Sequence, residues 1–198
     1  MKNTDVAQVA GKLISLRKVW ASAEHVTYEG LLEVKRDSGI ADTIVILLED
    51  PNAVETGKYY DIVGQFRSRD VDRNGKLKVE LYIYVQKITT LPIKFYNNEI
   101  TLTGYICKKP TLRNTPSGKQ ISDLLVACNY SEDKSAYIPV ISWGKGARRS
   151  GKLQVGTLVI VRGRLQSRTY KKEIDGTALE LTAYELSATS VEPLMNVD

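Results

Sequence analysis

The side chains with the most distinctive chemistry are basic and aromatic ones that gather in a single segment, residues 97–172. This segment holds fourteen Lys and Arg residues against four acidic ones, which gives it a net charge of +10. Its rings are Tyr105, Tyr130, Tyr137, Trp143 and Tyr170. Cations bind phosphate groups, and exposed aromatic rings stack on bases that are not paired. The segment therefore predicts a surface that binds single-stranded nucleic acid.

Strand periodicity assigns two of these rings to one face. In residues 136–143, side chains alternate between two faces of a strand. One face carries Tyr137 and Trp143, and the other carries Ile138 and Val140. Because the aliphatic pair suits a core, we predict that both rings are exposed and stack on bases. The alternative is that the two rings pack inside the fold, where large aromatic side chains commonly bury their area.

A second run, residues 157–170, alternates in the same way. One face is mostly apolar, and the other carries Arg162, Arg164 and Arg168 with Tyr170 at its end. A row of unpaired arginines cannot be buried, because desolvating each charge is too costly. We predict that the arginines contact phosphates or bases, since a guanidinium can do both, and that Tyr170 stacks. An ordinary solvated face is the alternative.

Further basic residues extend the predicted path through the loops. They are Lys109, Arg113 and Lys119 around the first turn of the segment, Lys145 after its third strand, and Lys171 and Lys172 in its last hairpin. Each of these could equally be a solvated surface charge. In the first half, Arg67 and Arg69 are interleaved with acids, and residues 1–96 carry a net charge of only +1. We therefore predict a structural, assembly or auxiliary binding role for that half.

These side chains must be positioned by a fold that the chain repeats. Matching glycines mark the repeat: Gly57 and Gly64 correspond to Gly156 and Gly163, 99 residues later, and Gly11 corresponds to Gly104, 93 residues later. Glycine inside a strand marks a tight bend or a close approach of another backbone. The glycines of the repeat therefore predict strongly curved strands, as in a small barrel.

Each copy is predicted to form five strands, since its runs are rich in Val, Ile, Tyr, Thr and Leu and bounded by turn residues. The predicted strands are residues 6–20, 24–36, 42–49, 58–69 and 76–89, then 99–107, 119–130, 136–143, 157–170 and 177–190, with a helix near 147–153. Strand spacing alone fits any small barrel or sandwich. Five strands with a helix after the third favour the OB-fold, so we predict an all-β chain with two tandem five-stranded OB-fold Greek-key barrels, at residues 1–90 and 97–192.

Composition limits the other classes of function. The chain has 198 residues, enough for two small domains, and 42% of them are hydrophobic. It has one histidine, two cysteines and no CxxC motif, so we expect no metal site, no cofactor and no catalytic activity. No apolar run approaches the roughly 20 residues that span a bilayer, and no secretory signal starts the chain. We therefore expect an intracellular protein without a membrane segment.

The second copy resembles the bacterial single-stranded DNA-binding protein family in an ordered set of short motifs. They are Leu102-Thr103-Gly104, Lys109-Pro110-Thr111-Leu112-Arg113, Thr115-Pro116-Ser117-Gly118-Lys119, Val126-Ala127-Cys128-Asn129, Tyr137-Ile138-Pro139, Trp143-Gly144-Lys145 and Gly163-Arg164-Leu165-Gln166-Ser167-Arg168-Thr169-Tyr170. The resemblance covers about half of the chain, and the first copy shares it only through the repeat. The whole chain is similar to the tandem version of the family, in which one chain holds two barrels.

The resemblance implies a non-enzymatic protein that coats single-stranded DNA with little sequence preference during replication, recombination or repair. It also implies a homodimer with four barrels, replication or repair proteins as partners, and a cytoplasmic, nucleoid-associated location in a bacterium or a phage or mobile-element origin. The alternative is a primosome-like or mobile-element adaptor that binds proteins first and nucleic acid, RNA included, second.

Two features depart from the family pattern. The chain ends in SVEPLMNVD, without the acidic tip ending in Phe through which family members recruit enzymes. The third strand of the first copy, TIVILLED, also lacks the aromatic residues of the matching stretch IPVISWGK. Recruitment through that tail is therefore not expected, and the third strand of the first copy does not support a binding role for that copy.

Overall fold

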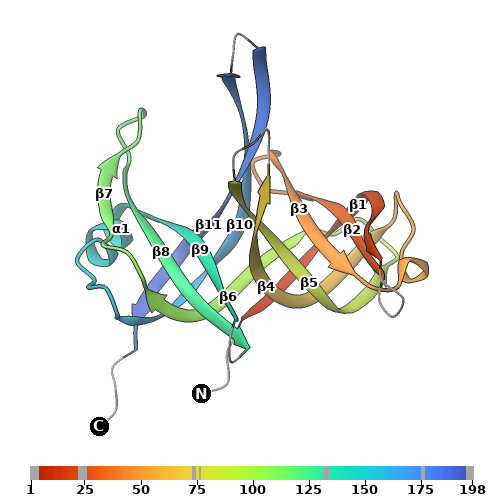
Figure 1. Ribbon diagram of the computed structural model, residues 1–198, viewed down its shortest axis with the longest axis horizontal. Coiled ribbons are helices and arrows are strands. Elements are labelled where there is room, and N and C mark those ends of the chain that lie inside the picture. Colours follow the sequence, from red (N-terminus) through yellow and green to blue (C-terminus); the bar gives the residue numbers. More distant parts are fainter. Residues whose placement is uncertain are drawn as a thin grey trace.

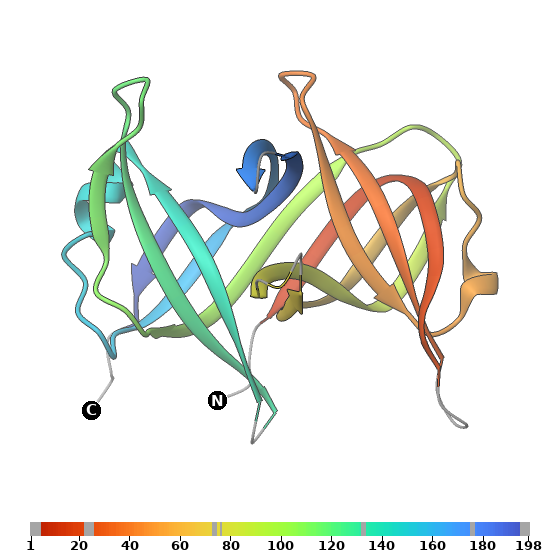
Figure 2. The ribbon, with the colours of Figure 1, turned by 45° about the horizontal axis from the view of Figure 1, so that its top comes forward.

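The computed structural model describes residues 5–21, 26–72, 75, 77–131, 134–174 and 177–194; for residues 21, 131, 169–174 and 177–181 it describes the backbone alone. Across these residues the chain forms eleven β-strands, one α-helix and one 3-10 helix. Two barrels lie side by side, the first coloured red through yellow and the second green through blue (Figure 1, Figure 2). The all-β class and the OB-fold architecture are confirmed.

The first barrel consists of five strands and one helical turn. They are β1 (Val6–Ala21), β2 (Val26–Lys35), β3 (Ala41–Leu48), η1 (Pro51–Ala53), β4 (Tyr59–Asp72) and β5 (Leu77–Leu91). The strands pair in the closed order β1-β2-β3-β5-β4-β1, with β3 and β5 parallel and the other pairs antiparallel. This is the strand order of an OB-fold, and the five predicted strands are confirmed to within a few residues.

The second barrel repeats this order and adds a short strand and a helix. Its elements are β6 (Asn97–Ile106), β7 (Thr111–Asn114), β8 (Gln120–Ser131), β9 (Lys134–Trp143), α1 (Gly144–Ser150), β10 (Leu158–Ile174) and β11 (Thr177–Pro193). The closed order is β6-β8-β9-β11-β10-β6. Strand β7 pairs with β8 outside this circuit and was not predicted, because its four side chains are all exposed and show no alternation.

Helix α1 begins three residues before the predicted helix and ends at Ser150 instead of residue 153. Gly144 starts it with a φ of +53°, a left-handed conformation that glycine adopts without strain. Beyond Gly151 the chain continues in tight turns, in which the amides of Lys152 and Leu153 donate to the carbonyls three residues earlier. The predicted end was wrong because these turns follow the helix directly.

The repeated glycines lie where one strand passes directly over another. A Cβ added to Gly11, Gly64, Gly104 or Gly163 would meet a backbone carbonyl oxygen of the facing strand at 2.3, 2.3, 2.4 or 2.3 Å respectively. Because contacts that short are excluded for real side chains, only glycine allows the strands to approach this closely. The close approach of a facing backbone, which glycine inside a strand marks, is therefore found at all four positions.

The two barrels share one continuous sheet. Residues 6–10 of β1 pair antiparallel with residues 97–101 of β6, so that all eleven strands form a single hydrogen-bonded order. This pairing joins segments that lie about 90 residues apart in the sequence. Alternation within each strand gave no sign of it, because pairing partners are chosen by the tertiary fold.

Two long hairpins hold each barrel to the other. The β4–β5 hairpin reaches β9, where Ser68 Oγ accepts the backbone N–H of Tyr137 at 2.9 Å. The β10–β11 hairpin reaches β3, where Ser167 Oγ accepts the backbone N–H of Thr43 at 2.8 Å. Ser68 and Ser167 are equivalent positions of the repeat. The registers of β3 against β5 and of β9 against β11 make Thr43 equivalent to Tyr137, one residue away from the alignment of the two sequences, which set Thr43 against Ile138. The duplication therefore produces the same hydrogen bond twice: the long hairpin of each barrel accepts, through a serine, a backbone N–H from the third strand of the other barrel.

Arg67 adds a contact between the barrels, and its repeat position is occupied by Gln166, which has no guanidinium. Its guanidinium lies 4.6 Å from the ring centroid of Tyr84 in the first barrel and 4.5 Å from that of Tyr130 in the second. A guanidinium over an aromatic face is attracted by the ring quadrupole. Arg67 therefore links the two barrels.

Candidate nucleic-acid interface

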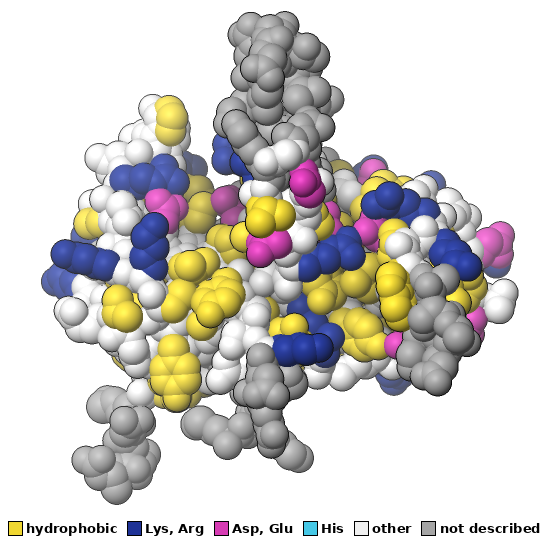
Figure 3. Space-filling view, in the orientation of Figure 1, with side chains coloured by type: hydrophobic (Ala, Val, Ile, Leu, Met, Phe, Trp, Pro, Cys, Tyr) yellow, Lys and Arg dark blue, Asp and Glu magenta, His cyan; other side chains and the backbone are white. Residues whose placement is uncertain are grey.

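Strand β9 presents its aromatic side chains outward, as predicted. Tyr137 is 51% exposed and Trp143 is 37% exposed. Ile138 and Val140, which alternate with them, are buried in the core of the second barrel. The alternative placement of these two rings inside the barrel is therefore wrong. In the face shown in Figure 3, hydrophobic patches lie beside basic side chains over both barrels.

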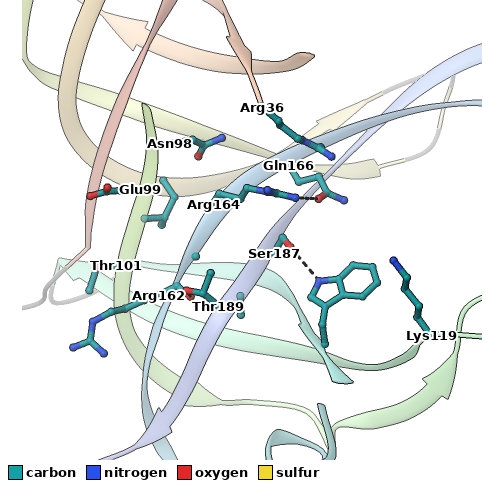
Figure 4. A pocket seen from close by; sticks show the side chains of 14 residues that line it. Arg36, Asn98, Glu99, Thr101, Lys119, Arg162, Arg164, Gln166, Ser187 and Thr189 are labelled. Atoms are coloured by element: carbon teal, nitrogen blue, oxygen red, sulfur yellow. Dashed lines mark hydrogen bonds between the residues drawn. The ribbon is translucent and has the colours of Figure 1, made fainter. Parts of the chain in front are cut away.

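Trp143 borders a trough of about 740 Å³ on the outside of the second barrel (Figure 4). Its indole Nε1–H donates to Ser187 Oγ at 3.1 Å, which fixes the plane of the ring. Four basic residues also line the trough: Lys119, Arg162, Arg164 and Arg36. Glu99 is the acid in its lining. An aromatic platform and several cations thus share one concave surface.

The arginine row lies on the outer face of β10, and Leu165, which directly follows Arg164, points the other way into the core. Arg162 and Arg164 are exposed and both line the trough, whereas Leu165 is fully buried. The side chain of Asn98 on β6 accepts from the Leu165 N–H at 2.9 Å and donates to the Leu165 carbonyl at 2.8 Å. This double hydrogen bond holds the strand that carries the row.

Acids on the neighbouring strand β11 approach both ends of the row, which the sequence pattern did not reveal. Arg162 Nη1 lies 3.4 Å from Glu192 Oε1, an exposed pair. Burial raises the pKa of Glu185, and the nearby charge of Arg168 acts in the opposite direction. Exposed pairs of this kind contribute little stability, so Arg162 can exchange Glu192 for a phosphate at small cost.

The predicted loop residues have different outcomes. Lys119 lines the trough, whereas Lys109 and Lys145 are exposed but are not among its described lining residues. Arg113 forms a two-bond pair with Asp123 across the β7–β8 hairpin, so its charge is already matched. The side chains of Tyr170, Lys171 and Lys172 lie outside the described part of the chain, and their predicted roles stay predictions.

Sequence reasoning missed Arg36, which belongs to the first barrel. Its Nε and Nη2 donate to the two carboxylate oxygens of Asp42 at 2.7 and 2.5 Å, and Asp42 is fully buried. The other trough residues lie at least 60 positions further along the chain. No spacing rule connects such positions, and only the turn between β2 and β3 brings Arg36 to the trough.

The matching region of the first barrel has different chemistry. By the strand registers of the two barrels, Glu49 occupies the repeat position of Trp143, and it accepts a hydrogen bond from the hydroxyl of Tyr84 at 2.5 Å. Arg69 is paired with the carboxylates of Glu29 and Glu80. Burial acts to raise the pKa of Glu29, but the hydrogen bonds from Arg17 and Arg69 outweigh it and lower the pKa. Arg69 of this barrel is thus engaged by the protein's own carboxylates.

Other kinds of site are not found in the described part of the chain. No group of three His, Cys, Asp or Glu residues there could hold a metal ion. Burial raises the pKa of the Cys128 thiol well above its ordinary value, which keeps it protonated and unreactive. No described helix is long and apolar enough to cross a membrane.

Comparison with known proteins gives a consistent set of matches. A model of the "Single-strand binding protein family" matches residues 97–194. Single-stranded DNA-binding protein B of Bacillus subtilis is 34% identical over 83 residues, which cover 38% of this chain and 74% of that protein. Single-stranded DNA-binding protein 1 of Clostridium acetobutylicum is 33% identical over 93 residues, or 43% of this chain and 84% of that protein.

Longer relatives are matched over a smaller share of their length. Single-stranded DNA-binding protein 2 of Listeria innocua is 31% identical over 102 residues, which cover 48% of this chain and 62% of that protein. For a Bacillus cereus relative that share is 58%. A crystal structure of the wild-type single-stranded DNA binding protein from Thermus aquaticus matches 100% of this chain and 96% of that chain, with a TM-score of 0.79 and 18% identity. At this identity the last match shows a shared fold, and it covers both barrels of the chain.

Proposed function

The chain belongs to the single-strand binding protein family, and from this premise we propose that it coats single-stranded DNA with little sequence preference and without catalysing a reaction. The processes served are DNA replication, recombination or repair. The observation that carries the proposal is a half-exposed tryptophan fixed at the rim of a trough lined by basic residues.

Bases stack on the rings of β9, and phosphates follow the cations beside them. Tyr137 and Trp143 point away from the core on the same face of the strand, so both rings are open to a base. Each base stacked on an aromatic ring contributes about 1–3 kcal/mol. Arg162 and Arg164 supply bidentate donors for phosphate, and Lys119 supplies a point charge at the other side of the trough (Figure 4).

This mechanism favours single strands over duplex for a physical reason. In a duplex, the faces of the bases are stacked on one another and are not available to a protein ring. A protein that stacks on bases must therefore open a duplex first, at a cost of a few kcal/mol per step. Phosphate contacts read no sequence, and every base has a π-face, so sequence preference is slight.

The two barrels have different roles in DNA binding. Residues 97–192 are the main DNA-binding domain, and residues 1–90 have a structural, assembly or auxiliary binding role. Glu49 at the repeat position of Trp143 supports this division, since a carboxylate repels phosphate where the second barrel offers a stacking ring. The pairing of Arg69 with two carboxylates supports it further.

The assembly is a homodimer that brings four barrels together, and the protein acts in the cytoplasm of a bacterium, with replication or repair proteins as partners. The bacterial relatives support the location. Sedimentation equilibrium of the full chain tests the assembly: twice the chain mass of 22.1 kDa is expected, and a monomer at micromolar concentration contradicts it.

Tryptophan fluorescence tests the function itself. The chain has two tryptophans, so Trp20→Phe leaves Trp143 as the sole tryptophan reporter. Oligo-dT should quench this variant strongly, whereas a duplex of equal length should bind at least tenfold more weakly, because stacking requires free base faces. Equal affinity for both forms refutes the mechanism. A matched RNA oligomer in competition decides whether the sugar matters, since stacking surfaces accept either.

The adaptor function makes a different prediction, which is tested by anisotropy of a labelled oligo-dT together with partner-binding and cellular assays. Trp143→Ala and Arg164→Ala remove the ring and one cation of the trough. If the protein is mainly an adaptor, these variants lose oligonucleotide binding but retain full binding to their protein partners and full function in the cell. Loss of both nucleic-acid binding and cellular function supports DNA coating as the primary activity.

A further inference from the structure

The nucleic-acid trough is built from both barrels, and we propose that Arg36 of the first barrel contacts a phosphate of the DNA bound to the second. This inference rests on the proposed function and deepens it. It starts from the composition of the trough lining, in which Arg36 and Arg164 come from different barrels. It means that one DNA strand touches the first barrel in spite of that barrel's nearly balanced charge.

The local sequence fixes the backbone of Arg36. The N–H of Arg36 donates to the carbonyl of Ile40 at 2.9 Å, and the N–H of Gly39 donates to the carbonyl of Arg36 at 2.8 Å. Gly39 has a φ of +83°, in the left-handed region that glycine tolerates. These two bonds close the turn between β2 and β3 tightly, so Arg36 sits at a defined point at the end of the hairpin.

The side chain is fixed by a buried carboxylate that also bonds to the second barrel. Asp42 is fully buried, and Arg36 forms a two-bond pair with it. Asp42 Oδ1 also accepts the backbone N–H of Ser167 on β10 at 2.9 Å. Breaking a buried ion pair from one side is costly, because the remaining charge is left without a partner. Arg36 is therefore held rigidly against the strand that carries the arginine row.

This pairing does not exhaust the donors of Arg36. A guanidinium has five N–H donors, and the two bonds to Asp42 use two of them. The pair also orients the fork, so that little side-chain entropy remains to be lost when an anion binds. The hydrogen bonds to Asp42 are the largest effect on the pKa of Arg36 and raise it, so the guanidinium stays charged.

The surface around Arg36 is continuous with the rest of the trough. A second hollow of about 200 Å³ adjoins it and is lined by Arg36, Asn98 and Arg164, which also line the trough, together with Asp37. In both ribbon views the β2–β3 turn and the β7–β8 turn project on the same side of the molecule, with the β10–β11 hairpin between them (Figure 1, Figure 2). A strand that leaves Trp143 past Arg164 thus arrives at Arg36.

The ligand chemistry is that of a phosphodiester. Arg36, Arg164, Arg162 and Lys119 outnumber Glu99 in the trough lining, so the site favours an anion. A planar guanidinium with free donors matches the oxygens of a phosphate bidentately. The expected contact is sequence-independent and therefore suits a protein that coats DNA.

Arg36→Gln tests this contact, with Arg17→Gln as the matched control. Both variants remove one cation that pairs with a buried carboxylate of the first barrel, but Arg17 and Glu29 do not line the trough. Binding of fluorescein-labelled oligo-dT to the full chain is measured by anisotropy over a range of KCl concentrations. Circular dichroism confirms that each variant is folded.

We expect Arg36→Gln to weaken binding about tenfold, as for the loss of one charge-assisted hydrogen bond, and to make the slope of log K against log salt shallower by about 0.7. Arg17→Gln should stay within about twofold of the wild type, with an unchanged slope. If the two variants change the affinity and the slope equally, only net charge matters and the proposal is overturned.

Loss of the Asp42 partner lowers stability, so a second variant keeps the test decisive. In Arg36→Gln/Asp42→Asn, the two amides can pair and no buried charge is left alone. The double variant should bind as weakly as Arg36→Gln, whereas Asp42→Asn alone keeps Arg36 and an acceptor oxygen to orient it, so it should bind more tightly than the double variant. Wild-type binding by the double variant overturns the proposal. A wild-type protein that does not prefer single strands instead refutes the proposed function.

Discussion

Replacing Trp143 with alanine isolates the stacking interaction from the charge of the trough. The ring is 37% exposed and is fixed by its hydrogen bond to Ser187, so it is already oriented before a base arrives. Stacking of one base on an aromatic side chain contributes about 1–3 kcal/mol. Taking about 2 kcal/mol, we expect Trp143→Ala to raise the Kd for oligo-dT about thirtyfold.

Two further substitutions show whether the effect comes from the aromatic face of Trp143: one keeps an aromatic ring there, and the other removes the second tryptophan as a control. Trp143→Phe keeps an aromatic face but loses the hydrogen bond to Ser187, so binding should fall by less than about fivefold. Trp20→Ala removes the other tryptophan, which is 54% exposed on β1 of the first barrel and does not line the trough. Its affinity should remain within about twofold of the wild type.

Anisotropy of a labelled oligo-dT is the suitable assay, because it does not depend on the tryptophan that is being removed. Urea unfolding of each variant shows whether the fold is intact, since part of the Trp143 ring is buried and its loss also costs stability. The stacking mechanism is refuted if folded Trp143→Ala binds oligo-dT as tightly as the wild type. It is also refuted if Trp20→Ala loses as much affinity as Trp143→Ala.

The remaining predictions concern salt, pH and packing. If the four cations that line the trough all contact phosphates, log K should fall with log salt at a slope of about −3, and a slope near zero in a KCl series contradicts phosphate binding. Asp5 is buried, and its burial raises the pKa to about 6 from 3.8, against opposing effects of the Thr103 backbone and Arg67. Because this carboxyl holds its proton more tightly in the folded state, its contribution to stability is fully present below about pH 4 and is lost as the pH rises through about 6. Urea unfolding should show that Asp5→Asn gains about 2 kcal/mol relative to the wild type between pH 4 and pH 7, whereas an unchanged difference means that Asp5 is not perturbed. A Cβ on Gly104 would meet the Ala127 carbonyl oxygen at 2.4 Å, so Gly104→Ala should lower the free energy of unfolding by about 2 kcal/mol or more; a loss under about 0.5 kcal/mol shows that the strands can separate without strain.

Local patterns predicted much of the fold and part of the site. The alternation of β9 placed Tyr137 and Trp143 outward and Ile138 and Val140 inward, and the structure confirms all four. A strand has a period of two whatever it pairs with, so the sequence of a single strand contains this information. The repeated glycines also located points where two strands approach closely, because only glycine fits at such points.

Contacts between distant segments could not be predicted in this way. Arg113 is matched by Asp123 and Arg162 by Glu192, so two cations assigned to DNA already have acidic neighbours across a strand pair. Which residues face each other depends on strand register, and a shift of one residue would change every partner. The charges of these residues can be read from the sequence, but their neighbours across the strand pair cannot.

The sequence by itself determined that this chain is a duplicated β-barrel protein with a basic, aromatic surface in its second half, because composition and periodicity are properties of short stretches. Only the tertiary structure decided that β1 pairs with β6, that two hairpins exchange equivalent serine contacts, and that Arg36 reaches the trough of the other barrel. These features join residues from about 60 to more than 120 positions apart, and such contacts form only when barrel closure, twist and register are all fixed together.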